Sequence, residues 1–178
     1  GVRIYGPGAS AAQDLEPEYV TVSTNSRTAW VSLQEANAIA TVDLPSATVT
    51  DVAPLGLKDH SLAANALDPS DRDGGIAIGT WPVKGLYQPD AITSYAVRGQ
   101  HYLVTANEGD TRDYGCYTEE ARVSSLVLDP VAFPNAPALK LNSALGRLTV
   151  STTSPAGPGG VTELHVPGGR SVSVRDSA

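Results

Sequence analysis

The sequence predicts an all-β protein, and within that class a partial β-propeller: about two and a half to three four-stranded antiparallel blades of a larger ring. Three observations support this prediction. The 17 Gly and 13 Pro residues, with no Met and only 17% charged residues, favour short strands and turns over helices. Short segments that alternate apolar and polar residues recur at regular spacing, and some of them belong to an internal repeat.

The first four strands are expected in a continuous run near the N-terminus. The segments are "YVTVST" (19–24), "TAWVSL" (28–33), "NAIATVDL" (37–44) and "ATVTDV" (47–52). Each pair is separated by two to four polar or turn-forming residues. This pattern predicts a four-stranded antiparallel meander.

An internal repeat then relates this meander to a second region. "EPEYVT" at 16–21 matches "QPDAIT" at 88–93, and "WVSLQE" at 30–35 matches "LVTANE" at 103–108. In both places a Pro-acid pair leads into one strand, and the next strand ends in an amide followed by Glu. Repeated four-stranded units of this kind are typical of a β-propeller.

The repeat divides the chain into three expected blade units, at about 16–52, 88–129 and 139–178. Residues 53–88, rich in Asp, Gly and Pro, are expected to be a long insertion between blades. Three blades are too few to close a ring, and open sheet edges promote aggregation. We therefore expect the missing blades to come from the rest of a longer chain or from another subunit.

The strand order also predicts a charged rim. Successive antiparallel strands alternate in direction, so the loops after the second strand and between blades are expected at the same end of the sheets. This places Gln34-Glu35, the insertion 53–88 and residues 107–114 on one face.

Three clusters could carry chemistry on this face. In "LDPSDRDGG" (67–75), Asp68, Asp71 and Asp73 resemble an oxygen-rich calcium loop, but the spacing does not fit the EF-hand. The alternative is a loop whose Asp side chains bond to their own backbone.

The second cluster is "NEGDTRDY" (107–114). Glu108, Asp110 and Asp113 could bind a hard cation, whereas Arg112 could clamp an anion such as phosphate. The alternative is an internal salt bridge that holds the loop. In the third cluster, "GLKDHS" (56–61), Lys58 and His60 are candidate ligand or anion contacts, with a structural role as the alternative.

Several classes of function are excluded or lack a motif. The net charge of −7 would repel a nucleic-acid backbone. The chain has no apolar run of about 18 residues for a membrane span. Walker, Gly-x-Ser-x-Gly and His-Glu-x-x-His motifs are absent, and no catalytic residue is assigned. Cys116 is the single cysteine, so it has no partner for a disulfide within this chain.

The sequence resembles the choice-of-anchor I family of secreted or cell-surface proteins, which are related to YncE-like repeat proteins and to a mesenchyme-specific cell-surface glycoprotein of sea urchins. The resemblance spans nearly the whole chain and rests on "LEPEYVTVS", "AWVSLQEANAIATVDL", "LGLKDHSL", "LDPSDRDGGIAI", "WPVKGLYQPDAI", "YLVTANEGDTRDY", "EEARV" and "GGRSVSV". Residues 151–160, "STTSPAGPGG", depart from the family's Asp/Gly-rich pattern here.

The resemblance implies an extracellular or cell-surface propeller that binds or scaffolds an unknown protein or surface partner. Calcium is the one cofactor that the acidic loops suggest. The alternative is a metal-dependent, alkaline phosphatase-like phosphoesterase, in which the carboxylates would hold cations and Arg112 would orient phosphate.

Overall fold

The computed structural model describes residues 1–177, and it confirms the all-β class. Strands hold 40% of the residues and helices 8%. The chain forms two compact units. The first comprises residues 1–56, 86–110 and 168–178, and the second comprises residues 57–85 and 111–167. The second unit is thus made of two insertions into the chain of the first. None of the helices in residues 1–177 is long and apolar enough to cross a membrane.

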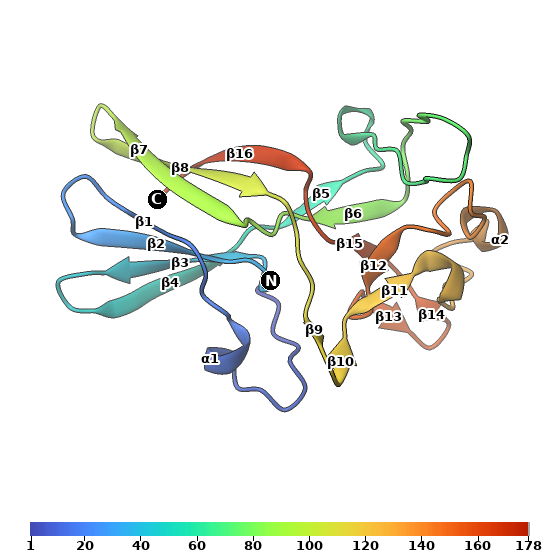
Figure 1. Cartoon of the computed structure of the whole chain (residues 1–178), viewed down its shortest axis with the longest axis horizontal. Coiled ribbons are helices and arrows are strands. Elements are labelled where there is room, and N and C mark those ends of the chain that lie inside the picture. Colours follow the sequence, from blue (N-terminus) through green and yellow to red (C-terminus); the bar gives the residue numbers. More distant parts are fainter. Residues whose placement is uncertain (178) are drawn as a thin grey trace. The chain divides into compact units, whose positions relative to one another are not determined.

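The first sheet of unit 1 is the predicted meander. Its strands follow one another in the order β1 (Val20–Val22), β2 (Thr28–Leu33), β3 (Ala38–Asp43) and β4 (Thr48–Pro54), as Figure 1 shows. All three pairings are antiparallel. A four-residue turn joins β3 to β4, and there the Asp43 carboxylate accepts a hydrogen bond from the Ser46 amide at 3.0 Å. A short helix, α1 (Ala11–Asp14), precedes this sheet.

The second sheet of unit 1 has the order β16-β8-β7. Strands β7 (Ala91–Val97) and β8 (Gln100–Asn107) form a hairpin. Its two turn residues, Arg98 and Gly99, have φ values of 52° and 85°, as the tight turn of a two-residue hairpin requires. Strand β16 (Ser171–Asp176) then pairs antiparallel with β8, so the third strand of this sheet comes from the far end of the chain.

The predicted third blade unit at 139–178 does not form a four-stranded sheet of its own. Three of its strands join partners outside this range: β12 (Thr149–Ser151) pairs with β11 (Glu120–Arg122), β15 (Leu164–Val166) with β6 (Val83–Leu86), and β16 with β8. The alternating pattern of each segment predicts a strand. It does not specify which distant strand will be the partner.

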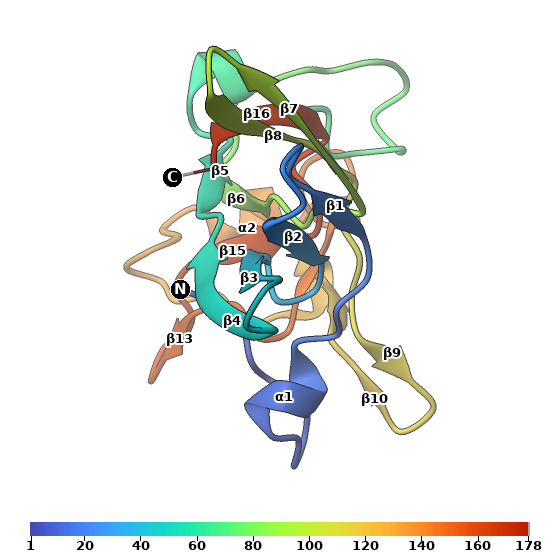
Figure 2. The same ribbon diagram turned by 90° about the vertical axis from the view of Figure 1, so that its left-hand side faces the viewer.

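The two sheets of unit 1 pack face to face, with β7 against β1 and β2, as the turned view in Figure 2 shows. Their shared core contains Trp30 and Ile39 from the first sheet and Leu55 directly after its last strand. The second sheet contributes Ile92 and Leu103. The apolar faces of the two sheets interdigitate, which is consistent with neighbouring blades of a partial propeller.

Both outer faces of this pair of sheets are also apolar. The first sheet carries a groove of about 250 Å³ lined by Val31, Val49 and Val52, among other residues. On the second sheet, Val172 and Val174 are 72% and 60% exposed. Sheets with two apolar faces are suited to being covered on both sides, and the arrangement is consistent with a partial propeller. The described residues form no closed ring.

Unit 2 is built from short strands around its own core. A three-stranded sheet has the order β15-β6-β5, where β5 spans Leu57–Asp59. Two-stranded hairpins are formed by β9 (Asp113–Tyr114) with β10 (Tyr117–Thr118) and by β13 (Ala156–Gly157) with β14 (Gly160–Val161). Short helical turns complete the unit: η1 (Ala63–Asn65), η2 (Val123–Ser125) and α2 (Ala136–Leu139).

The core of unit 2 explains why the predicted insertion is longer than a simple loop. Leu67 and Val83 from the insertion are buried in one cluster with Leu145, Val150 and Leu164 from residues 111–167. The insertion therefore contributes strands and core side chains. It lengthens the repeat because it lies between β4 and β7.

Candidate functional site

The ends of four strands in unit 1 gather acidic side chains at one edge. Glu16 and Glu18 precede β1, and Glu35 follows β2. Asp90 precedes β7, and Asp110 follows β8. Within an antiparallel pair, the start of one strand lies beside the end of the next. We call these five residues the acidic rim.

Burial and neighbouring negative charges raise the pKa of two rim carboxylates, Glu35 and Glu18. Glu35 is buried, with 9% of its surface exposed. Its burial, reinforced by the charges of Glu18, Glu16 and Asp110, raises its pKa from 4.5 to about 7, although a backbone hydrogen bond acts in the opposite direction. Glu18 is exposed, and its pKa is also raised, first by partial burial and then by Asp90, Asp110 and Glu16. The rim is therefore an electrostatically coupled group.

A buried amide framework holds the loops that carry this charge. The Asn37 side chain accepts a hydrogen bond from the Gln88 amide at 2.9 Å and donates one to the Gly56 carbonyl at 2.9 Å. The side chain of Gln88, which is fully buried, donates to the Asp110 carbonyl at 2.7 Å and accepts from the Gly168 amide at 3.1 Å. Because buried amides with several partners fix backbone geometry, Gln88 positions the Asp110 loop.

The predicted convergence of Glu35 with Asp110 is thus present in unit 1. Glu108, on the same loop as Asp110, is exposed. The other members of the predicted rim, in the insertion and after Asp110, belong to unit 2. In residues 1–177, no group of three or more His, Cys, Asp or Glu side chains is arranged to hold a metal ion.

The Asp-rich loop of unit 2 has the local bonding that was the alternative to a calcium loop. Asp68 accepts from the amides of Ser70 and Ala77 at 3.3 and 3.1 Å, and Asp73 accepts from the Gly75 amide at 3.4 Å. Asp71 instead forms an ion pair with Arg147. The hydrogen bond from Arg147 lowers the Asp71 pKa.

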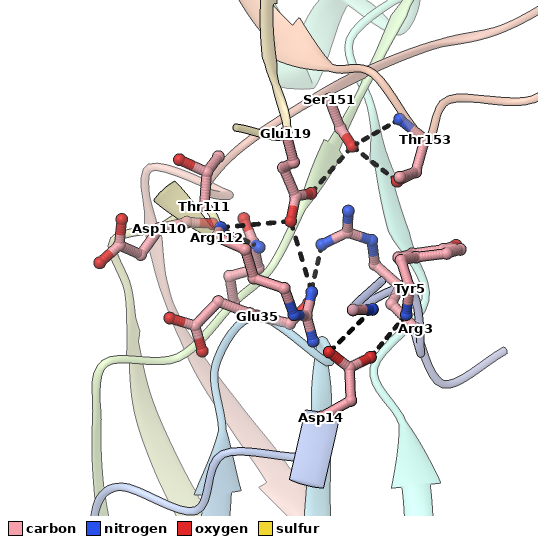
Figure 3. A network of polar contacts seen from close by, with 12 residues as sticks. Arg3, Tyr5, Asp14, Glu35, Asp110, Thr111, Arg112, Glu119, Ser151 and Thr153 are labelled. Atoms are coloured by element: carbon pink, nitrogen blue, oxygen red, sulfur yellow. Dashed lines mark hydrogen bonds and ion pairs between the residues drawn. The ribbon is translucent and has the colours of Figure 1, made fainter. Parts of the chain in front are cut away.

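Arg112 forms a buried ion pair within unit 2. Its guanidinium lies 3.3 Å from the Glu119 carboxylate, and both side chains have no exposed surface. The other Glu119 oxygen accepts a hydrogen bond from the Ser151 hydroxyl at 2.9 Å, and this hydroxyl also contacts Thr153, as Figure 3 shows. The observed partner of Arg112, Glu119, lies outside the "NEGDTRDY" cluster. Asp113 lies nearby in sequence, exposed on β9.

Lys58 and His60 lie on and just after β5. His60 is 2% exposed, and its Nδ1 lies 2.6 Å from the Asn65 carbonyl oxygen. This contact ties together the turn that contains Ser61. Lys58 is half-buried within the strand. The geometry of His60 fits the structural role that was its alternative.

Sequence reasoning identified Glu35 and the Asp110 loop but did not assign Glu16, Glu18 or Asp90 to the site. The signal was present in the repeat, because "EPE" and "QPD" place an acid directly after proline at equivalent positions. A Pro-acid pair that leads into a strand places its charge at the same end as the loop after the next strand.

The fold and rim define an all-β protein with an acidic edge, and its sheets are consistent with a partial propeller. A comparison with protein families is more specific: the choice-of-anchor I domain model matches residues 1–178. The chain therefore belongs to the choice-of-anchor I domain family. Membership in this family indicates a surface-anchored or secreted protein. Comparisons with curated proteins and with solved structures give no match.

Proposed function

We propose that this domain is a non-enzymatic binding or scaffolding module of a secreted or cell-surface protein, and that its acidic rim binds cationic groups. The observation that carries the proposal is the clustering of the rim carboxylates around Glu35, whose pKa is raised to about 7 by its burial and then by the charges of Glu18, Glu16 and Asp110. Repulsion between negative charges that lie this close together raises the free energy of the protein when no cation is bound. A bound cation would offset that repulsion.

The proton on Glu35 makes this proposal specific. A cation next to the rim favours the charged form of Glu35, so binding releases a proton at pH values between 4.5 and about 7. Affinity should therefore increase as the pH rises through this interval. A surface that binds through apolar contacts would not show this dependence.

The cation can be calcium or the basic side chains of a partner protein. Calcium prefers carboxylate and carbonyl oxygens, and extracellular calcium modules bind it with a Kd of about 10⁻⁴ to 10⁻³ M. The rim supplies carboxylates on the ordered loops around Gln88. A Lys/Arg-rich partner surface would be attracted by the same charges and would be sensitive to salt.

A phosphoesterase function is not favoured by a specific contact. In that alternative, Arg112 would orient a phosphate. Arg112 has no exposed side-chain surface, and its guanidinium is paired with Glu119. A buried arginine in an ion pair is suited to stabilising its own loop.

Calorimetric titration can test the proposal. Calcium chloride and a lysine-rich peptide would be titrated separately into the protein at pH 5.5 and pH 8. We expect binding at pH 8, weaker binding at pH 5.5, and loss of binding in the double variant Glu18→Gln, Asp110→Asn. The control Asp51→Asn removes an exposed charge from β4 in the same unit and should bind like the wild type.

The two ligands distinguish the two kinds of cation. Binding of the peptide without calcium would assign the rim to a protein partner, and binding of calcium alone would assign it to the metal. The absence of heat with both ligands, or an equal loss in the Asp51→Asn control, would contradict the proposed function.

A further inference from the structure

Unit 2 contains a small depression that includes none of the rim residues. Its volume is about 230 Å³, and it lies where β5 and β6 meet the segment before β15. Its polar lining consists of Asp59, Ser61, Lys84, Thr162 and Glu163, and its apolar lining of Pro82, Val83, Ala132 and Phe133. The volume is below the roughly 300 Å³ of the smallest typical ligand pockets. The depression is therefore large enough for a ligand that consists of a single ring.

One wall of the depression is a fixed ion pair. Lys84 on β6 bonds to Glu163, and the other Glu163 oxygen lies 2.5 Å from Nε2 of His165. His165 is the direct neighbour of Lys84 across the parallel β6/β15 pairing. Burial alone would raise the Glu163 pKa, but the hydrogen bonds from Lys84 and His165 outweigh it and lower the pKa. Glu163 is therefore charged at neutral pH and holds Lys84 in place.

The second carboxylate is Asp59, at the end of β5. Its Oδ1 accepts a hydrogen bond from the Ser61 amide at 2.9 Å, and the bonds to Ser61, followed by the charge of Lys84, lower its pKa. The Asn65 side chain donates to the Asp59 carbonyl at 2.9 Å and fixes the same turn. With Glu163 and Lys84, Asp59 gives the depression one net negative charge when His165 is neutral.

These charges restrict the class of ligand. An anion such as phosphate would face two carboxylates against one lysine that is already paired. A purely apolar ligand would remove water from three charged groups without replacing their hydrogen bonds. A hydroxyl group, by contrast, both donates and accepts. It can donate to Asp59 while it accepts from Lys84, Ser61 or Thr162.

The apolar lining adds a second requirement. Pro82 and Ala132 are exposed and line the same depression as the charged groups, whereas Phe133 and Val83 are buried. A ligand that matches both parts needs hydroxyl groups on its edge and C–H groups on its face. A pyranose ring has both.

We propose that this depression binds a single neutral sugar ring, with Asp59 and Lys84 as its main hydrogen-bonding partners. A ligand of about a dozen non-hydrogen atoms is expected to bind with a Kd of about 1 mM. This inference is independent of the proposed function, because it concerns other residues and another ligand. Neutral sugar binding should also change little with salt concentration, unlike cation binding at the rim.

The test is an NMR titration of the ¹⁵N-labelled protein with the methyl glycosides of glucose, galactose and mannose. We expect at least one glycoside to shift amides of β5, β6 and β15 in a saturable way. Asp59→Asn and Lys84→Gln should each weaken binding about tenfold, the loss expected when one partner of a bond to a charged group is removed. Asp51→Asn and Lys140→Gln are the matched controls and should bind like the wild type.

Three results would overturn the proposal. The first is the absence of saturable shifts in these strands with all three glycosides. The second is equal affinity in Asp59→Asn and the wild type. The third is that methylamine, added as a cationic probe, shifts these amides at lower concentrations than any glycoside does. The wild-type titration decides the question by itself if a variant fails to fold.

Discussion

Replacing Glu35 with glutamine should stabilise the protein at high pH and have little effect at low pH. Glu35 has a pKa of about 7 in the folded protein, against 4.5 for an ordinary glutamate side chain. Between these values the folded state holds a proton that the unfolded state has released. The contribution of Glu35 to the free energy of unfolding is therefore most favourable below pH 4.5, and it is lost as the pH rises from 4.5 through 7.

The magnitude follows from the size of the shift. Each pKa unit corresponds to about 1.36 kcal/mol, so a rise from 4.5 to about 7 costs about 3 kcal/mol of folding free energy once the pH exceeds 7. Glutamine keeps the shape of the side chain and has no charge to desolvate. Glu35→Gln should therefore be more stable than the wild type by up to about 3 kcal/mol at pH 8.

Urea denaturation at pH 4, 6 and 8 measures this difference. Other carboxylates, such as Asp43 and Asp71, have lowered pKa values and give stability a slope of the opposite sign at low pH. The difference between variant and wild type removes their contribution. Asp51→Asn controls for the loss of one negative charge. A difference that does not change between pH 4 and pH 8, or a Glu35→Gln variant that is less stable at pH 8, would refute the reasoning.

Two further predictions concern positions that hold the loops. Glu119→Gln should destabilise the protein by about 3–5 kcal/mol in urea denaturation, because it removes the buried charge that pairs with the Arg112 guanidinium. The exposed neighbour Glu120→Gln is the control, and an equal loss in both would contradict the prediction. Gly168→Ala should cost at least about 1–2 kcal/mol, since Gly168 has a φ of 81° and a Cβ there would collide with the Glu108 carbonyl. The amides of residues 108–110 should shift in the same variant, and unchanged stability with an unchanged spectrum would contradict this view of Gly168.

The fold class was predictable because strand formation leaves a local signal. Alternation and turn residues predicted the meander, and residues 20–54 form it with β1 to β4 in chain order. The pairing of β16 with β8 was not predictable in this way. Alternating residues such as Val172 and Val174 fit any sheet with one covered face, and the choice of partner depends on packing between distant segments.

The candidate site was also predictable only in part. Strand alternation predicted that Glu35 and Asp110 share an edge, because this follows from the direction of successive strands. The burial of Arg112 was not predictable from "NEGDTRDY", because its ion-pair partner lies outside this segment. Glu119 lies seven positions later and removes Arg112 from solvent, and no pattern within "NEGDTRDY" shows this.

The geometry of the acidic rim is maintained at a local cost in both repeats. Glu16 and Gln88 occupy equivalent positions before the prolines of "EPE" and "QPD", and their φ values are 43° and 46°. A left-handed conformation is unfavourable for a residue with a side chain, and a following proline restricts it further. Strain of this kind persists where the surrounding structure over-determines it, and such positions concentrate at functional sites. The same strained conformation therefore directs Glu18 and Asp90 to one edge. There, the repulsion between their charges adds to the free-energy cost of the strain. A bound cation would offset that repulsion.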